Sequence, residues 1–176
     1  MVIWTIGIAN SGKTTLTQLV YKRLKPYLPN LVRLDGDIIR AIFGHDVDHS
    51  VEGRRINAQR LSNLSKFLAD EGVHVIAAVL SIFPEWQEWN RQNIKDYGQV
   101  YLKVSVETAT RRDTKDLYAR AIDGKIQNVV GIDIPFPEPN DSDLIIDNNQ
   151  ECDDFEDMVQ KVLSLNVIQN ALTGRQ

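Results

Sequence analysis

The segment GIANSGKTT, residues 7–15, combines glycine, lysine and hydroxyl residues at a spacing that can hold a phosphate chain. It fits the pattern G-x-x-x-x-G-K-[ST]. An apolar run over residues 2–8 leads into it and leucines at helical spacing follow it, which is the strand–loop–helix context that the pattern requires. Backbone N–H groups of such a loop can point at phosphate oxygens, aided by the positive end of the helix. A chance match in a glycine-containing turn is the alternative, and the flanking strand and helix argue against it.

Within this loop, Lys13 is placed to reach the β- and γ-phosphates of a nucleotide, and Thr14 to offer its hydroxyl to Mg²⁺. The loop alone does not separate a kinase from a switch or a motor. A GTPase would carry a guanine-reading N-K-x-D segment, and the sequence has none. A motor ATPase would usually have an apolar strand ending in Asp or Glu, but the run over residues 74–80 ends at Ser81. A small-molecule kinase needs a second anion site and a carboxylate near the acceptor hydroxyl.

The segment LDGDIIR, residues 34–40, supplies both requirements. Asp35 and Asp37 lie at a predicted strand end, and Arg40 follows one helical turn later. Aspartates at such a position can orient Mg²⁺-bound water or accept the proton of an attacking hydroxyl. A plain strand-to-helix turn with an N-cap aspartate, a role assigned here to Asp37, is the simpler interpretation. The phosphate loop upstream favours the catalytic one.

Two further segments are rich in cations. Residues 52–60 contain Arg54, Arg55, Asn57 and Arg60. Residues 110–118 contain Arg111, Arg112, Asp113 and Lys115. A solvated charged helix face explains either run. In an acidic protein, an anion clamp explains the segment 52–60 at least as well. The segment 110–118 could close over a nucleotide as a lid.

Apolar runs and helical patterns alternate along the chain. Strands are predicted over residues 2–7, 31–37, 74–80, 99–106 and 144–147. Helical spacing follows over residues 16–24, 61–68 and 155–163. Strands without polar alternation between helices indicate an α/β fold, with a parallel sheet covered on both faces. Ligands bind such sheets beyond the carboxyl ends of the strands, where the segments described above fall.

The bulk properties restrict the class of protein. The chain has 176 residues, 43% apolar and 25% charged, and we expect a single domain over residues 1–176. A net charge of -4 argues against broad nucleic-acid binding. The single cysteine, Cys152, excludes an intramolecular disulfide and is expected to be a surface or half-buried thiol. Because no apolar run approaches membrane-spanning length and no leader is evident, we expect a cytoplasmic protein without membrane contact.

Taken together, these segments resemble the adenylylsulfate (APS) kinases, which phosphorylate the 3′-hydroxyl of adenosine 5′-phosphosulfate. The likeness runs from the first strand to about Pro139. After the phosphate loop, LDGDIIR corresponds to L-D-G-D-N-x-R and GRRINAQR to D-R-x-x-N-x-x-R. RDTKDLYARAIDGKI corresponds to R-D-x-K-G-L-Y-x-x-A-x-x-G-x-I, and GIDIPFPEP to G-I-D-x-P-Y-E-x-P. The resemblance implies a P-loop kinase (Rossmann-like) three-layer fold with a mostly parallel five-stranded sheet.

The resemblance also assigns roles. ATP is implied as phosphoryl donor and Mg²⁺ as cofactor, with Lys13, Asp35 and Asp37 catalytic and Thr14 and Asp35 at the metal. The residues expected to bind ATP are Gly7, Asn10, Ser11, Gly12, Lys13, Thr14, Thr15, Arg111 and Arg112. The residues expected to bind the acceptor are Asp37, Arg40, His49, Arg54, Asn57, Ser81, Ile82, Lys115 and Val129. Small nucleotides are the expected partners, and the sequence allows a homodimer without determining the oligomeric state.

The departures from the family concentrate on the acceptor side. The two phenylalanines that sandwich the acceptor adenine in the family fall on His49 and Val129. The family's S-P-Y-R is Ser-Ile-Phe-Pro at residues 81–84, so its arginine is missing, and Asp116 replaces the glycine of K-G-L-Y. Losing the aromatic faces forfeits stacking of about 1–3 kcal/mol per base contact. A smaller base with a less anionic tail would suit these changes.

A relative of the APS kinases fits that description, namely the cytidine diphosphoramidate kinases of capsule phosphoramidate synthesis. We therefore favour a cytidine diphosphoramidate acceptor. The alternative is that Trp86, Trp89 or a shifted aromatic rebuilds the adenine clamp and APS remains the acceptor. Two further alternatives are a nucleotide-binding regulatory or scaffold protein without catalysis, and a nucleoside or nucleoside-monophosphate kinase of the same fold. Intact Lys13, Thr14 and both aspartates argue against the non-catalytic alternative.

Overall fold

The computed structural model describes residues 1–150 and 155–174, so Cys152 lies outside the described residues. Strands and helices alternate as predicted. The strands are β1 (Val2–Ile6), β2 (Leu31–Asp35), β3 (His74–Val79), β4 (Tyr97–Lys103) and β5 (Leu144–Asp147). The helices are α1 (Lys13–Leu24), α2 (Gly36–Ile42), α3 (Val51–Asp70), α4 (Pro84–Asn93), α5 (Val106–Arg111), α6 (Leu117–Ile122), α7 (Glu156–Leu163) and α8 (Asn166–Thr173).

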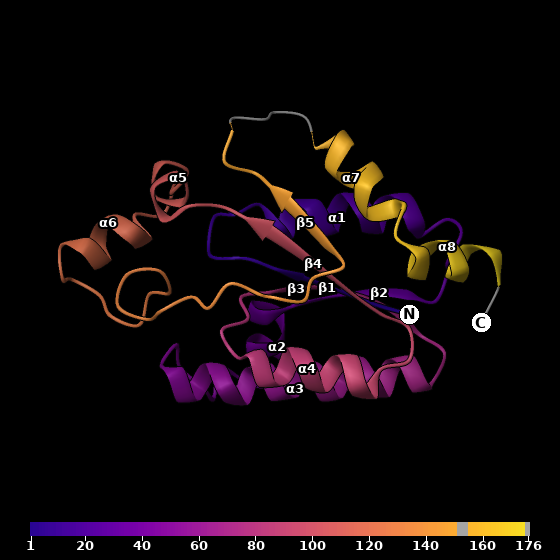
Figure 1. The fold of residues 1–176 in the computed structure, drawn as a ribbon. Coiled ribbons are helices and arrows are strands. Elements are labelled where there is room, and N and C mark those ends of the chain that lie inside the picture. The colour runs from indigo at the N-terminus through magenta and orange to yellow at the C-terminus, as the bar shows by residue number, and fades with distance from the viewer. Residues whose placement is uncertain (151–154, 175–176) are drawn as a thin grey trace.

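The five strands form one sheet in the order β2-β3-β1-β4-β5, and every neighbouring pair is parallel. Helices α1, α7 and α8 cover one face of the sheet, and α2, α3 and α4 cover the other (Figure 1). Parallel strands need crossover helices, and these helices bury both faces of the sheet, which is why the strands read as continuous apolar runs. The predicted three-layer α/β fold is confirmed.

Apolar side chains from α1 and α7 pack together over β1 and β4. Leu16, Val20 and Leu24 of α1 are buried, as are Met158 and Val162 of α7. Burying a side chain of this size stabilises the fold by about 1.5–3 kcal/mol. The helix predicted from the spacing of residues 155–163 is therefore present. The helix after it, α8, was not predicted, and it is anchored by the fully buried Ile168.

Strand ends differ from the predicted ones where the chain turns toward the site. β1 ends at Ile6, and the chain packs closely at Gly7, where a Cβ would lie 2.6 Å from Ser11 Oγ and 2.7 Å from the Leu102 carbonyl oxygen. β4 ends at Lys103, short of the predicted residue 106, because Ser105 caps α5 by accepting a hydrogen bond from the Thr108 N–H at 3.1 Å. Both turns lie at the carboxyl end of the sheet, beyond which α5 and α6 lie (Figure 1).

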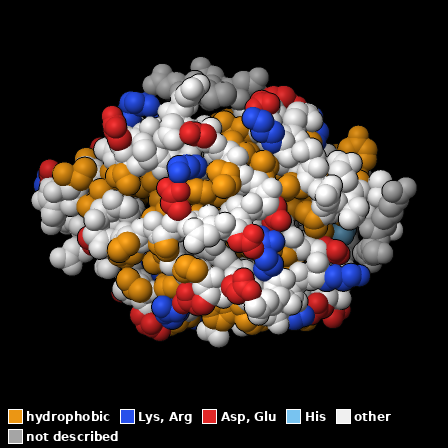
Figure 2. Space-filling model, viewed as in Figure 1, with side chains coloured by type: hydrophobic (Ala, Val, Ile, Leu, Met, Phe, Trp, Pro, Cys, Tyr) orange, Lys and Arg blue, Asp and Glu red, His pale blue; other side chains and the backbone are white. Residues whose placement is uncertain are grey.

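The described helices give no membrane-spanning candidate, since none is both long and apolar enough to cross a bilayer. On the face drawn in Figure 2, acidic and basic side chains are interspersed among apolar ones instead of gathering into a basic stripe. That distribution fits the net charge of -4.

Candidate active site

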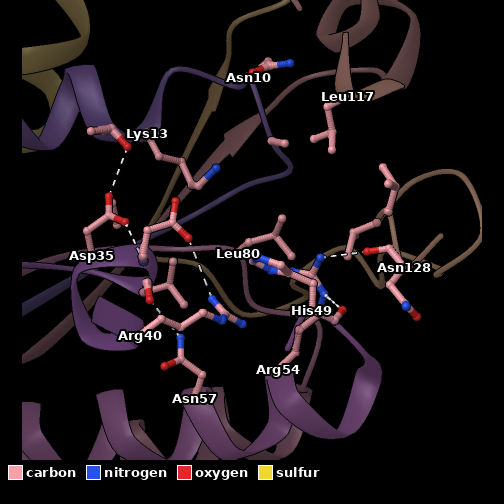
Figure 3. A pocket seen from close by; sticks show the side chains of 18 of the residues that line it. Asn10, Lys13, Asp35, Arg40, His49, Arg54, Asn57, Leu80, Leu117 and Asn128 are labelled. Atoms are coloured by element: carbon pink, nitrogen blue, oxygen red, sulfur yellow. Dashed lines mark hydrogen bonds and ion pairs between the residues drawn. The ribbon is translucent and has the colours of Figure 1, made fainter. Parts of the chain in front are cut away.

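A cavity of about 570 Å³ lies at the carboxyl ends of the central strands. Several parts of the chain form its walls: the loop after β1, the turn from β2 into α2, the end of β3 with Leu80, His49 with the first half of α3, and the segment from Lys115 to Val130 (Figure 3). This is the sheet edge at which parallel α/β folds bind ligands. The predicted site residues that line it are Asn10, Lys13, Thr14, Asp35, Asp37, Arg40, His49, Arg54, Asn57, Lys115 and Val129.

Asn148 and Phe155 pack against the glycine-rich loop and hold it in place. Gly12 has a φ of 94°, in the left-handed region, and forms the N-cap of α1. A Cβ at Gly12 would lie 3.1 Å from the Phe155 ring and 3.2 Å from the Asn148 amide nitrogen. The same amide donates a hydrogen bond to the Ser11 carbonyl at 3.0 Å. Glycine is therefore required at this position, and the start of α1 is fixed with its free N–H groups able to bind an anion.

Lys13 lies over the loop with its ammonium group turned back toward the cavity. Its Nζ donates to the Ile8 carbonyl at 2.6 Å, and Ser11 Oγ lies at 3.4 Å. Burial lowers the pKa of Lys13 from 10.5 to about 8, against the opposing effect of Asp35 and then Asp37. A nucleotide phosphate beside this ammonium group would favour its charged form, so binding and protonation are coupled at this residue.

Asp35, the last residue of β2, connects that strand to the phosphate loop through a side-chain hydrogen bond. Its Oδ2 accepts from the Thr14 hydroxyl at 3.1 Å, and its Oδ1 accepts from the Asp37 N–H at 3.0 Å. The N-cap of α2 is therefore Asp35, and the assignment of that role to Asp37 was wrong. The prediction failed because α2 begins directly at Gly36, without the intervening turn that an Asp37 cap would need.

Asp37 lies in the first turn of α2, and its side chain is 88% exposed. Arg40 Nη1 lies 3.8 Å from Asp37 Oδ1. Asp35 thus has both oxygens engaged by hydrogen bonds, whereas the Asp37 carboxylate is held only by a long ion pair in the described structure. The two carboxylates are placed for different tasks.

The opposite end of the cavity is cationic. Arg40 is 7% exposed, and its Nε has no hydrogen-bond partner among the described residues. Arg54 donates from Nε to the His49 carbonyl and from Nη2 to the Asn128 carbonyl, both at 2.8 Å (Figure 3). Burial first, and then Arg40, lower the pKa of Arg54. Two neighbouring guanidinium groups in a partly buried site favour an anionic ligand, which would offset their repulsion.

His49 and Val129, 80 positions apart, both lie at this cationic end. Burial lowers the pKa of His49, and the charges of Arg40 and Arg54 lower it further against the opposing effect of Asp37 and Asp48, which favours the neutral form of its ring. None of the described residues that line the cavity is Phe, Tyr or Trp. Trp86 and Trp89 pack against each other outside the cavity, with ring centroids 5.7 Å apart.

Residues 1–147 match the model of the adenylylsulphate kinase family. The chain belongs to this family. It is 39% identical over 162 residues to the cytidine diphosphoramidate kinase of Campylobacter jejuni, covering 92% of this chain and 94% of that protein. It is also 39% identical over 147 residues to the adenylyl-sulfate kinase of Thermodesulfovibrio yellowstonii, covering 82% and 74% of the two chains.

A solved structure of the APS kinase CysC of Mycobacterium tuberculosis, in complex with AMPPNP and APS, superimposes with a TM-score of 0.83. Its sequence is 28% identical, and the match covers 96% of both chains. The chain is therefore a kinase with the fold of the APS kinases.

Some residues assigned from the APS kinase pattern lie outside the cavity lining. Ser81 is buried, and its hydroxyl accepts from Gln87 Nε2 at 3.2 Å. Ile82 is buried in the apolar cluster that contains Phe83. On the donor side, Gly7, Ser11, Gly12 and Thr15 belong to the loop and the start of α1, and Arg111 ends α5.

Arg112 is held at the rim of the donor side. It donates to the carbonyls of Asn148 at 2.8 Å and Gln150 at 2.7 Å. Asp116, at the glycine position of the K-G-L-Y pattern, has a φ of 55°. Glycine adopts this left-handed conformation without cost, and aspartate adopts it at a moderate one. Sequence reasoning missed the wall residues Leu117, Gln127 and Asn128, which carry no charge and no distinctive spacing.

Proposed function

We propose that this kinase transfers the γ-phosphoryl group of ATP to the ribose 3′-hydroxyl of a nucleotide with a modified 5′-phosphate, and that the acceptor is cytidine diphosphoramidate. The observation that carries the proposal is the absence of an aromatic side chain among the described residues of the cavity wall, which include His49 and Val129. By the sequence resemblance, these two residues correspond to the family's phenylalanines. The similarity to the Campylobacter jejuni enzyme supports the same acceptor.

The donor half has the groups that an ATP site needs. Lys13 and Thr14, at the start of α1, line the cavity, so the free N–H groups of this helix end and the Lys13 ammonium can bind the β- and γ-phosphates. Thr14 and Asp35 fit Mg²⁺, since a hydroxyl and a carboxylate 3.1 Å apart are the hard oxygen donors that this ion takes together with substrate phosphates. Bound there, Mg²⁺ would neutralise charge on the phosphates.

The reaction requires a base beside the acceptor hydroxyl. As the 3′-oxygen forms its bond to the γ-phosphorus, the bond from that phosphorus to the β–γ bridging oxygen breaks and ADP leaves with the electron pair. We assign the hydroxyl proton to the Asp37 carboxylate, because Asp35 is engaged by Thr14 and by the Asp37 N–H. Lys13 stabilises the negative charge that the leaving ADP gains.

The cationic end is proposed to hold the 5′-tail of the acceptor. Arg40 and Arg54 supply guanidinium groups for its phosphate oxygens, and the Arg40 Nε still has an unused donor. A neutral His49 and the aliphatic Val129 would border the base. Each lost aromatic face lowers affinity for a stacked base by about 1–3 kcal/mol, and this loss weighs more on a purine because a pyrimidine has less area to stack.

Adenylylsulfate is the second candidate acceptor. It is favoured by the family model and by the Thermodesulfovibrio yellowstonii relative, whose identity of 39% equals that of the cytidine diphosphoramidate kinase. For this acceptor, Trp86, Trp89 or a shifted aromatic residue would have to replace the family's phenylalanines around the adenine. Neither Trp86 nor Trp89 lines the cavity. We further propose that the protein acts in the cytoplasm, where ATP is present, and supplies activated phosphoramidate for capsule polysaccharide.

Restoring the family's aromatics tests the acceptor assignment. In the double variant His49→Phe, Val129→Phe, the ratio of kcat/KM for APS to kcat/KM for cytidine diphosphoramidate is expected to rise at least tenfold, because two stacking faces return. Initial rates of ADP release with each acceptor measure it. Ile122→Phe, which adds a ring at an exposed site outside the cavity, is the matched control. An unchanged ratio in a folded double variant would show that these two positions do not select the acceptor.

A further inference from the structure

Asn128, Val129 and Val130 of the cavity wall begin a short loop, residues 128–134, that closes on the carboxylate of Asp133. Asp133 Oδ2 accepts from the Asn128 N–H at 2.5 Å, and Oδ1 accepts from the Val129 N–H at 2.6 Å. Asp133 belongs to the G-I-D-x-P motif, for which the reaction described above has no role. Asp133 does not itself line the cavity.

The carboxylate holds the start of the loop, while backbone hydrogen bonds such as that from the Gly131 N–H to the Ile134 carbonyl, at 2.8 Å, hold the rest. Asn128 has a φ of 67° and Gly131 a φ of 96°, so two of its residues are in the left-handed region. A non-glycine residue there is strained and persists only where its surroundings impose the conformation. The two hydrogen bonds to Asp133 hold the backbone in this conformation at Asn128 and at its neighbour Val129.

The loop is connected to the cationic end of the cavity through Asn128. With its N–H bound to Asp133, the Asn128 carbonyl accepts from Arg54 Nη2 at 2.8 Å, and Arg54 Nε in turn donates to the His49 carbonyl at 2.8 Å (Figure 3). A continuous set of hydrogen bonds therefore runs from Asp133 to the guanidinium group of Arg54.

Asp133 is suited to remain ionised in this position. The Asn128 N–H makes the largest contribution to lowering its pKa, and the Val129 N–H and the charge of Arg54 lower it further, while burial opposes them. A carboxylate that accepts two backbone hydrogen bonds gives stronger bonds than an amide oxygen could.

We propose that Asp133 is a positioning residue for the acceptor: it fixes the Asn128 carbonyl, and through it the Arg54 guanidinium, and it sets the place of Val129. The inference rests on the proposed function, in which this end of the cavity binds the acceptor nucleotide. Losing Asp133 should then weaken acceptor binding while the ATP half, built on the loop after β1, is unaffected.

The test is Asp133→Asn, which keeps the shape but presents an NH₂ group to one of the two backbone N–H groups. With the acceptor that the wild-type enzyme uses, whether cytidine diphosphoramidate or APS, KM for the acceptor is expected to rise about tenfold while KM for ATP changes less than twofold. Asp123→Asn removes a carboxylate of the same charge that pairs with Lys125 at the surface, and should change neither value. Equal increases in both KM values, or an unchanged acceptor KM, would overturn the proposal.

A double-mutant cycle separates positioning from general loosening. In the Arg54→Ala background, Asp133→Asn should add less than twofold to the acceptor KM, because the residue through which it acts is gone. A full additional effect would contradict the proposed connection. Should Asp133→Asn not fold, Asp133→Glu displaces the carboxylate by one methylene, and the same changes are expected in the same direction.

A spectroscopic measurement needs no acceptor. The Arg54 Nε–H signal in ¹H–¹⁵N spectra should shift and exchange faster with solvent in Asp133→Asn, and remain unchanged in Asp123→Asn. An unchanged Arg54 signal would overturn the positioning role even if the wild-type enzyme phosphorylated neither nucleotide. A wild-type enzyme that phosphorylated neither nucleotide would contradict the proposed function, whatever the Arg54 signal showed.

Discussion

Replacing Lys13 with alanine is expected to lower kcat by about 10³-fold or more, because a preorganised cation at the transferring phosphoryl group contributes on this scale. The ammonium group lies at the loop, 2.6 Å from the Ile8 carbonyl, where it can move onto a phosphate without rearrangement of the backbone. ADP release in a coupled assay, with either acceptor, measures the loss. A rate within tenfold of wild type would contradict the assignment of the loop to the γ-phosphate.

The pH dependence of ATP affinity is the control that isolates the charge of Lys13. Before nucleotide binds, the pKa of Lys13 is about 8, so the ammonium form that phosphates require is lost above that pH. Affinity for ATP should therefore fall as the pH rises above 8 in the wild-type protein and stay flatter in Lys13→Arg. Because the folded-state pKa lies below the ordinary 10.5, the cost of this buried charge to stability is fully present below pH 8 and is relieved toward pH 10.5.

Replacing Asp37 with asparagine is expected to lower kcat by about 10²–10⁴-fold, the range that general base catalysis contributes. ATP affinity should remain at the wild-type value, since the Asp37 carboxylate is exposed and makes no bond to the phosphate loop in the described structure. Single-turnover rates and equilibrium binding of a fluorescent ATP analogue measure the two quantities separately.

Asp35→Asn provides the contrast. Its amide oxygen can still accept from the Asp37 N–H and cap α2, but it loses one charged metal ligand beside Thr14. We expect activity to fall and to recover partly at raised Mg²⁺ concentration, which it should not do in Asp37→Asn. Asp70→Asn, at the far end of α3, removes a carboxylate that pairs with Lys66 and should leave both quantities unchanged. Full activity in Asp37→Asn would remove that carboxylate from the chemistry.

The parts of the site that are local in sequence were predictable. The spacing of Gly7, Gly12 and Lys13 between a strand and a helix determines a phosphate loop whatever the rest of the chain does, and the apolar runs indicated all five strands. Because the carboxyl ends of parallel strands share one edge, the segments after β1 and β2 had to meet there.

The parts that depend on tertiary contacts were not predictable from pattern alone. Which aspartate caps α2 is decided by where the helix begins, and sequence spacing allowed both. Ser81 lies at a strand end, yet Gln87 binds its hydroxyl in the interior, a contact across a turn that no motif encodes. The hydrogen bond from Arg54 to the Asn128 carbonyl spans 74 positions and uses a backbone atom, so the types of the two residues do not predict it.

The most direct test of the central claim is ATP turnover by the wild-type enzyme with cytidine diphosphoramidate and with APS, side by side under the same conditions. A cavity without aromatic faces at His49 and Val129 should give a higher kcat/KM with the cytidine nucleotide, by about tenfold or more, from the difference in stacking. Mass analysis of the product should place the new phosphate on the 3′-oxygen. A higher kcat/KM with APS would contradict the account of the acceptor site.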